Sequence, residues 1–284
     1  MYVITVIAAQ GTLREERVLA FLTALAGTHW NWLAAGEAAD IFVDQQPDQF
    51  DQVWAQAQQE KIDLVLQVNK NRKKKLLLAD MDSTMIGQEC IDELADMAGV
   101  GEQVKDITAR AMNGELDFEK ALKSRVALLK GLPLSIIDKV IQERITFTDG
   151  GKLLIDTMKR HGAYCALVSG GFTAFTAYVA QSLGFDEHRA NSLLVTGDTL
   201  TGEVGLPIVG RDAKVTALEE LSLKLGITAA EVIAVGDGAN DLGMLQCAGL
   251  GVALHAKPTV AAQTNVVINF GNLRSLCFMQ GYSL

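Results

Sequence analysis

Acidic side chains are concentrated directly after two short apolar segments of the chain. Asp80, Met81 and Asp82 follow the first segment, and Asp237 and Asp241 follow the second. Because crowded carboxylates repel one another, such a group favours a divalent cation, and carboxylate oxygens suit Mg²⁺. One carboxylate could attack phosphorus, and another could give or take a proton. The pattern therefore predicts a magnesium-dependent phosphoryl-transfer site.

Other polar groups are suited to binding the oxygens of a phosphate. Ser169, Gly170 and Gly171 follow another apolar segment, and a glycine lets the backbone approach a phosphate closely. Lys214 could supply a fixed positive charge to the phosphoryl group. Taken singly, these residues are more often turn or surface residues, and the motif 236–241 alone could be a Ca²⁺ loop. Their order along the chain makes the combination specific.

Short apolar segments separated by helical patterns indicate a parallel sheet that is covered on both faces. These segments are 76–80, 163–168, 231–235, 249–254 and 265–269. In a doubly wound sheet, ligands bind beyond the carboxyl ends of the strands, so the motif residues would meet at one edge. The helical and charged segment 87–147 interrupts the alternation. We therefore expect an α/β core with an inserted helical cap.

The first part of the chain has a different pattern. Strand-like and helical segments alternate in the order βαββαβ, which is the ferredoxin-like α+β pattern. The segments are 2–8, 13–26, 29–34, 38–43, 47–60 and 61–68. The polar stretch 69–75, with its basic run 72–75, is expected to be a solvated linker. The sequence thus predicts a domain at 1–74 and a second domain at 75–284.

Composition limits the partners and the compartment. A net charge of −9 argues against a nucleic-acid partner, which requires a basic surface. No segment has the ~18 uninterrupted apolar residues of a membrane span, and the N-terminus lacks the features of a signal peptide. Cys165 and Cys247 have apolar neighbours in the sequence and are expected to be buried, reduced thiols. We therefore expect a cytoplasmic protein.

Residues 76–284 resemble the haloacid dehalogenase superfamily of phosphotransferases, and within it the phosphoserine phosphatase branch. The superfamily's four motifs are present as Asp80-Met81-Asp82-Ser83-Thr84, Ser169, Lys214 and Gly236-Asp237-Gly238-Ala239-Asn240-Asp241. Glu89 and the cap segments 112–118 and 124–126 match the branch. The resemblance implies a Mg²⁺-dependent hydrolase that converts O-phospho-L-serine to L-serine and phosphate, the last step of serine biosynthesis.

The resemblance also implies a role for each core residue. Asp80 would be the nucleophile that forms an aspartyl-phosphate, and Asp82 would be the general acid and base. Mg²⁺ would be held by Asp80, Asp82, Asp237 and the Met81 carbonyl, and Asp241 would support these ligands from behind. The phosphate would be contacted by Ser169, Gly170, Lys214 and Asn240.

In the cap, the resemblance implies residues that bind the amino-acid part of the substrate. Glu89 would bind the ammonium group of the substrate, and Arg125 would bind its carboxylate through a bidentate pair. Met112 and Phe118 would line the cap. Because these residues lie in the inserted segment, binding of the substrate could close the site against water.

Two other functions remain compatible with the motifs. A phosphotransferase could form the same intermediate and pass the phosphoryl group to another alcohol, such as homoserine. The other is a phospho-Asp receiver or an amino-acid sensor, because receivers also gather acids, a serine or threonine and a lysine around a phosphorylated aspartate. The paired acids Asp80 and Asp82 and the inserted cap argue against the receiver, which needs neither a leaving-group acid nor a lid.

The N-terminal segment resembles the amino-acid-sensing domains known as ACT domains. In such domains the first strand–helix turn, here Gly11, Thr12 and Arg14, often binds an amino acid. Small sheets of this kind often pair across a two-fold axis, so we expect a homodimer through this domain. The sequence does not identify a ligand for it.

Overall fold

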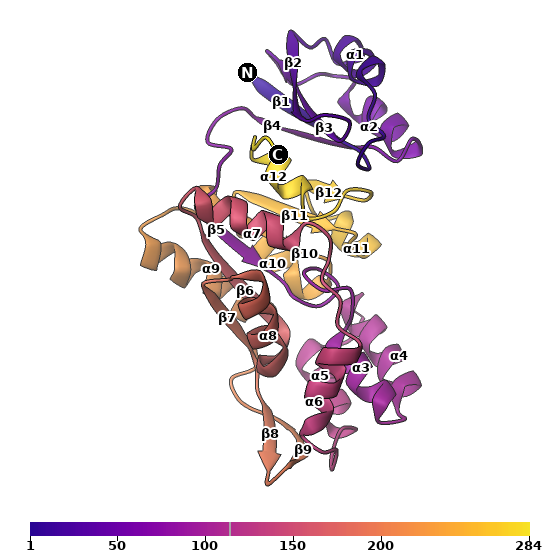
Figure 1. Ribbon diagram of the computed structural model, residues 1–284, viewed down its shortest axis with the longest axis vertical. Coiled ribbons are helices and arrows are strands. Elements are labelled where there is room, and N and C mark those ends of the chain that lie inside the picture. The colour runs from indigo at the N-terminus through magenta and orange to yellow at the C-terminus, as the bar shows by residue number, and fades with distance from the viewer. Residues whose placement is uncertain (114) are drawn as a thin grey trace.

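The computed structural model describes residues 1–113 and 115–284, which are arranged in three tiers (Figure 1). An N-terminal α+β unit lies at one end, a parallel sheet flanked by helices lies in the middle, and the helical cap lies at the other end. Within the described ranges, no helix is both long enough and apolar enough to cross a membrane.

The N-terminal unit has the predicted βαββαβ order. Its four antiparallel strands lie in the order β2-β3-β1-β4. Ile4 and Val6 of β1 pack against Phe21 of α1 and Val53 of α2 on one face of the sheet. The elements are β1 (Tyr2–Ile7), α1 (Glu15–Ala24), β2 (His29–Ala34), β3 (Ala38–Val43), α2 (Phe50–Gln59) and β4 (Asp63–Val68).

The central sheet is parallel throughout, which confirms the predicted fold class. Its strand order is β12-β11-β10-β5-β6-β7. All five predicted strands are present. The strands are β5 (Leu76–Ala79), β6 (Tyr164–Phe172), β7 (Glu187–Asn191), β10 (Val232–Gly236), β11 (Leu250–Leu254) and β12 (Val266–Ile268).

Successive residues of a strand point to opposite faces of the sheet, so both faces of this sheet carry apolar side chains. Helices cover both of these apolar faces. Leu77 belongs to the buried cluster formed with α7 and α8, whereas Leu76 and Leu78 belong to the cluster formed with α9 and α10. The helices and short 3₁₀ turns are α7 (Gly151–Arg160), α8 (Thr173–Leu183), α9 (Arg211–Leu225), η1 (Ala229–Glu231), η2 (Ala239–Asp241), α10 (Leu242–Cys247), α11 (Pro258–Ala261) and α12 (Ser275–Met279).

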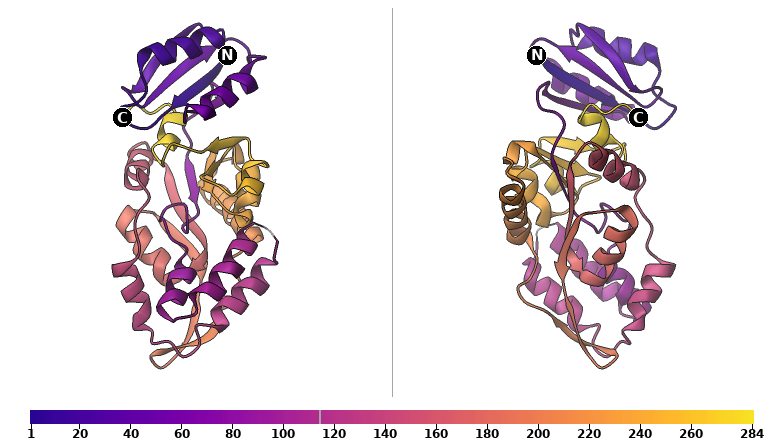
Figure 2. Two further views of the ribbon diagram at one scale, coloured as in Figure 1. Left: turned by 90° about the vertical axis from the view of Figure 1, so that its right-hand side faces the viewer. Right: turned by 60° about the vertical axis from the view of Figure 1, so that its left-hand side comes forward.

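The cap is inserted between β5 and β6, as expected. A two-stranded hairpin that the sequence did not reveal runs beside the cap helices (Figure 2), and Thr199 of this hairpin forms a β-bridge with Pro133. The cap helices are α3 (Cys90–Met97), α4 (Gly101–Met112), α5 (Phe118–Ala127) and α6 (Ser135–Glu143), and the hairpin strands are β8 (Leu193–Thr196) and β9 (Thr199–Val204).

The segment between the two sheets is less solvated than predicted. Arg72 was expected to lie in water, but its side chain is 10% exposed and pairs with Asp40 at 2.6 Å. Lys74 of the same basic run contacts the core, where its Nζ donates a hydrogen bond to the Ala230 carbonyl at 2.8 Å. The basic run therefore joins the N-terminal unit to the core. A domain boundary at residue 74 stays a prediction.

One cysteine also differs from its expected place. Cys165 is buried, as expected, but Cys247 is exposed because it lies at the last position of the short helix α10. Its apolar neighbours Met244 and Leu245 face the core, and the helix turns Cys247 away from them.

Candidate active site

The turn after β5 carries the first two acids. Asp80 and Asp82 are buried at 3% and 7% exposure. Asp82 Oδ1 accepts a hydrogen bond from the backbone N–H of Cys90 at 2.9 Å, and Asp82 Oδ2 accepts one from Ser169 Oγ at 3.3 Å. The start of α3 and the end of β6 thus orient the Asp82 carboxylate.

Lys214 on α9 lies beneath these acids and is fully buried. Its Nζ lies 2.7 Å from Asp80 Oδ1 and 2.6 Å from Asp241 Oδ1. Burial lowers the pKa of Lys214, but the two carboxylates outweigh burial and raise it above its ordinary value. This lysine is therefore charged and holds Asp80 in place.

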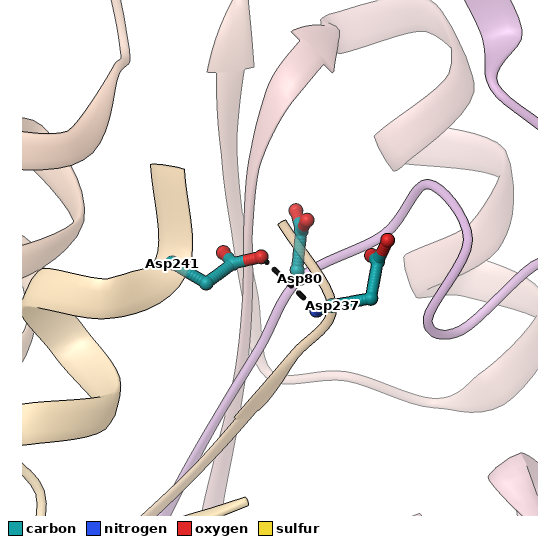
Figure 3. A group of neighbouring side chains, drawn as sticks. All are labelled: Asp80, Asp237 and Asp241. Carbon is teal, nitrogen blue, oxygen red and sulfur yellow. Dashed lines mark hydrogen bonds between the residues drawn. The ribbon is translucent and has the colours of Figure 1, made fainter. Parts of the chain in front are cut away.

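Three carboxylates gather at the carboxyl ends of β5 and β10. One oxygen from each of Asp80, Asp237 and Asp241 lies within 4.8 Å of the others, and all three residues are buried. Asp80 and Asp237 point to one side, while Asp241 reaches toward the backbone of Asp237 (Figure 3). Asp241 Oδ2 accepts hydrogen bonds from the N–H groups of Asp237 and Gly238, which places it behind the other two.

The carboxylates are crowded beyond what Lys214 compensates. Burial and the nearby Asp241 raise the pKa of Asp80 well above its usual range and that of Asp237 to about 7. Asp237 Oδ1 accepts from Thr84 Oγ1 at 3.1 Å, whereas its buried Oδ2 has no hydrogen-bond partner among the described residues and only the distant charge of Lys257 Nζ, at 3.8 Å, beside it. A further positive charge at this place would relieve the repulsion.

The donor set fits Mg²⁺, which prefers carboxylate oxygens. Asp80 and Asp237 present their oxygens to a common point, and no histidine or cysteine belongs to the group. The metal roles of two further predicted ligands, Asp82 and the Met81 carbonyl, stay predictions. The Asp82 carboxylate lies outside this group, and the Met81 carbonyl already accepts N–H bonds from Thr84, Met85 and Ile86. The fit to a metal therefore rests on Asp80 and Asp237.

One pocket joins the acids to the cap. Gly170 lies at its edge, where an added Cβ would come within 2.6 Å of the Phe118 ring of the cap. The cap therefore closes over the sheet at this contact. The predicted residues that line the pocket are Asp80, Asp82, Glu89, Phe118, Arg125, Ser169, Gly170 and Asn240.

Asn240 and the backbone near Ser169 provide the polar lining. Asn240 is 7% exposed, and its buried Oδ1 has no hydrogen-bond partner within the ranges described. The backbone N–H of Gly171 donates to Ser169 Oγ at 2.9 Å. Asn191 at the end of β7 donates to the Gly170 carbonyl at 2.8 Å and so anchors this loop.

The two cap residues that were expected to read an amino acid both face this pocket. Glu89 Oε1 accepts a hydrogen bond from Ser83 Oγ at 2.7 Å. Burial, and then the charge of Asp82, raise the pKa of Glu89 well above its usual range. Arg125 is 2% exposed and has no carboxylate within 4.0 Å in the described part of the chain.

Sequence reasoning missed several residues of this site. Apolar pocket walls carry no motif signal, and side-chain anchors such as Asn191 depend on a strand that was not recognised. The side chain of Met112, an expected lining residue, lies outside what the structure describes. The missed lining residues are Ile91, Leu122 and Phe172.

Comparisons with known proteins agree with this geometry. Residues 77–246 match the model of the haloacid dehalogenase-like hydrolases. The probable phosphoserine phosphatase of Schizosaccharomyces pombe is 46% identical over 211 residues, which are 74% of this chain and 70% of that protein. The phosphoserine phosphatase of Haemophilus influenzae is 46% identical over 201 residues, but this chain spans only 64% of its length.

A solved structure agrees as well. The structure described as a phospho-aspartyl intermediate analogue of phosphoserine phosphatase has a TM-score of 0.70 and 43% identity, and the match covers 72% of this chain and 98% of that one. The chain belongs to the haloacid dehalogenase-like hydrolases, in their phosphoserine phosphatase family.

Proposed function

We propose that this protein hydrolyses O-phospho-L-serine to L-serine and phosphate through an aspartyl-phosphate on Asp80. The observation that carries the proposal is a pair of cap groups that form no ion pair within 4.0 Å among the described residues. Arg125 is a buried cation with no carboxylate within 4.0 Å among the described residues, and the Glu89 carboxylate accepts a hydrogen bond from Ser83 but pairs with no cation in the same part of the chain. Both face the pocket that holds Asp80.

A buried charge without a partner costs several kcal/mol, so such a pocket favours a ligand that brings the missing charges. Phosphoserine carries a carboxylate for Arg125 and an ammonium for Glu89. It also carries a phosphate for the edge where Ser169 and Asn240 lie. The three charged groups of the substrate thus match three different parts of one pocket.

In the first half of the reaction, a carboxylate oxygen of Asp80 attacks phosphorus, and the bond between phosphorus and the serine oxygen breaks. Asp82 gives its proton to that leaving oxygen, which forms free serine. Burial raises the pKa of Asp82, although the N–H of Cys90 and the charge of Lys214 oppose this shift. The raised pKa favours the protonated form that this step needs.

In the second half, Asp82 accepts a proton from water, whose oxygen attacks the phosphorus of phospho-Asp80. The bond between phosphorus and Asp80 breaks, which releases phosphate and restores the carboxylate. Lys214 stays beside Asp80 and offsets the negative charge. Mg²⁺ held by Asp80 and Asp237 would neutralise the phosphate oxygens and favour attack by a carboxylate.

Substrate reading by the cap is tested by comparing two substrates. Arg125→Ala should raise the KM for phosphoserine by about 10²-fold, because a charge-assisted pair to the carboxylate is lost. The KM for p-nitrophenyl phosphate, which has no carboxylate, should change by less than about twofold. Equal changes for both substrates would remove Arg125 from recognition of the carboxylate.

A second candidate function is transfer of the phosphoryl group to another alcohol. The enclosed pocket between Phe118 and Gly170 favours water, which is the smaller acceptor. Turnover of phosphoserine with added homoserine separates the two functions. Free phosphate in equal amount to serine supports the hydrolase, and phosphohomoserine would support the transferase.

A receiver or sensor differs from an enzyme in the lifetime of phospho-Asp80. The acid Asp82 lies in the pocket with Asp80, which favours rapid cleavage. Acid-quench labelling should find phospho-Asp80 only during turnover. A label that persists for minutes to hours after the substrate is removed would favour the sensor.

We also propose that the protein is cytoplasmic and dimerises through its N-terminal unit. The four cysteines are free, which fits a reducing compartment. Strand β2 is an edge of the sheet and leaves backbone groups open to pairing with a second copy. Analytical ultracentrifugation of the whole chain should give twice the monomer mass, and a monomer at micromolar concentration would contradict the dimer.

A further inference from the structure

A chain of hydrogen bonds, from buried Arg125 through buried Thr108 to half-buried Asp92, holds the Arg125 guanidinium in the cap. One terminal nitrogen, NH1, donates to Thr108 Oγ1 at 2.9 Å, and Nε donates to the Ala121 carbonyl at 3.2 Å. Thr108 Oγ1 in turn donates to Asp92 Oδ1 at 2.6 Å. Because an arginine can only donate, the direction of these hydrogen bonds runs from Arg125 through Thr108 to Asp92.

The three residues come from three different helices of the cap. Asp92 lies on α3, Thr108 on α4 and Arg125 on α5. Thr108 is 3% exposed and Arg125 is 2% exposed, so water does not compete strongly for these bonds. The hydrogen bonds therefore fix the guanidinium relative to the packing of the cap.

The Thr108 hydroxyl also separates two opposite charges. Burial lowers the pKa of Arg125, while the charges of Glu89 and then Asp92 oppose this shift, yet Arg125 and Asp92 form no ion pair within 4.0 Å. Without the hydroxyl between them, the guanidinium could turn and pair directly with Asp92. A guanidinium paired in this way would have less capacity to bind a second carboxylate.

We propose that Thr108 and Asp92 are positioning residues that keep the Arg125 guanidinium directed toward the carboxylate of the substrate. Thr108 both orients the guanidinium and prevents its direct pairing with Asp92. Neither residue lines the pocket, so they act through Arg125 and not on the substrate. This inference rests on the proposed function, in which Arg125 binds that carboxylate.

The first test is Thr108→Val, which removes the hydroxyl and keeps the shape of the side chain. The KM for phosphoserine should rise about tenfold, which corresponds to one lost hydrogen bond of a charged group. The kcat should stay within about twofold, because Thr108 touches no reacting atom. Activity toward p-nitrophenyl phosphate should be unchanged, and this activity also reports that the variant has folded.

Two further variants distinguish positioning from packing. Thr108→Ser keeps the hydroxyl and should keep the KM for phosphoserine within about twofold of the wild type. The double variant Thr108→Val, Asp92→Asn removes the competing charge, so its KM should fall back several-fold from that of Thr108→Val. If Thr108 and Asp92 only stabilised the packing of the cap, adding Asp92→Asn to Thr108→Val would raise the KM for phosphoserine further.

The possible outcomes separate this inference from the proposed function. If Arg125→Ala loses selectivity for phosphoserine but Thr108→Val does not, the positioning role is wrong and the proposed function stands. If Thr108→Val impairs both substrates equally, or if the double variant is worse than the single one, the positioning role is also wrong. If Arg125→Ala itself affects both substrates equally, the carboxylate role of Arg125 fails and the inference fails with it.

Discussion

At the scale of single residues, Gly171 leaves the space that the Asp82 carboxylate occupies. A Cβ at this position would lie 2.5 Å from Asp82 Oδ2 and 3.1 Å from Ser169 Oγ, which is closer than atoms normally approach. Gly171→Ala should therefore displace the general acid and lower kcat by about 10²-fold. Steady-state kinetics with phosphoserine checks this prediction.

Gly205→Ala is the matched control for Gly171→Ala. A Cβ at Gly205 would meet its nearest neighbour, Ser192, at 3.5 Å, which is ordinary contact. This control should keep the kcat of the wild type. A Gly171→Ala enzyme with full activity would show that Asp82 does not need its present position.

Lys214 links the nucleophile to the acid behind it. Because Lys214 Nζ lies between Asp80 and Asp241, Lys214→Met leaves two buried carboxylates without their cation. The free energy of unfolding should fall by about 3–5 kcal/mol, and kcat should fall by about 10²–10³-fold. Thermal unfolding and kinetics measure these two effects, and a variant as stable and active as the wild type would rule out the role.

Residues in motifs were predictable from the sequence, but residues that act through other residues were not. Asp80 and Lys214 stand in motifs whose order and surroundings carry information. Thr108 and Asn191 look like ordinary polar residues in the sequence, and their importance arises from contacts between distant elements. The metal role of the Met81 carbonyl stays a prediction, and the tight turn after β5 engages this carbonyl in three N–H bonds, which no local sequence pattern indicated.

At the scale of elements, strands with apolar or β-rich runs were predictable, including the edge strand β12, whereas the polar edge strand β7 was not. The inner strands have runs of apolar residues, whereas β7 has the sequence EHRAN and only Asn191 in it is buried. An edge strand such as β7 can fold with little apolar surface, and its sequence then has no distinctive pattern. The β8–β9 hairpin is likewise largely exposed, and its contact with the cap could not be read from local sequence.

The first residue of helix α5 closes the pocket. Phe118 packs over Gly170, and Asp117 caps the helix by accepting a hydrogen bond from the N–H of Lys120 at 2.9 Å. Phe118→Ala should open the site to water and lower kcat/KM about tenfold. Phosphoserine and p-nitrophenyl phosphate should be affected alike, because the ring excludes water and does not read the amino acid.

Phe118→Leu should restore most of this activity, because it keeps an apolar side chain of similar size. The comparison of both variants with both substrates provides the measurement. A loss confined to phosphoserine would mean that the ring contacts the amino-acid part of the substrate.

At the scale of the whole molecule, the N-terminal unit is bonded firmly to the core. Asp63 at the start of β4 is completely buried and accepts N–H bonds from Asn269, Phe270 and Gly271 at 3.0, 3.0 and 2.8 Å. The Arg72–Asp40 pair lies at the same junction. These bonds predict that the two parts unfold together.

Asp63→Ala tests whether the N-terminal unit and the core unfold together. Three buried N–H groups would lose their acceptor, so the free energy of unfolding should fall by about 2–4 kcal/mol. The kcat of the folded enzyme should stay within about twofold, because Asp63 is remote from the pocket. Asp63→Asn keeps one acceptor oxygen and should lose less stability.

Calorimetry of these proteins provides the measurement. A single unfolding transition that moves to lower temperature in Asp63→Ala supports a common folding unit. Two separate transitions in the wild type would show that the N-terminal unit folds independently of the core.

Hydrolysis of phosphoserine through Asp80 is tested most directly by phosphate release from phospho-L-serine, with and without Mg²⁺, for the wild type and Asp80→Asn. The wild type should release phosphate only with Mg²⁺, and faster than from phosphothreonine or sugar phosphates. Asp80→Asn should lose this activity by at least about 10³-fold, because the amide cannot form the phospho-enzyme. Release that persists in Asp80→Asn would contradict the account.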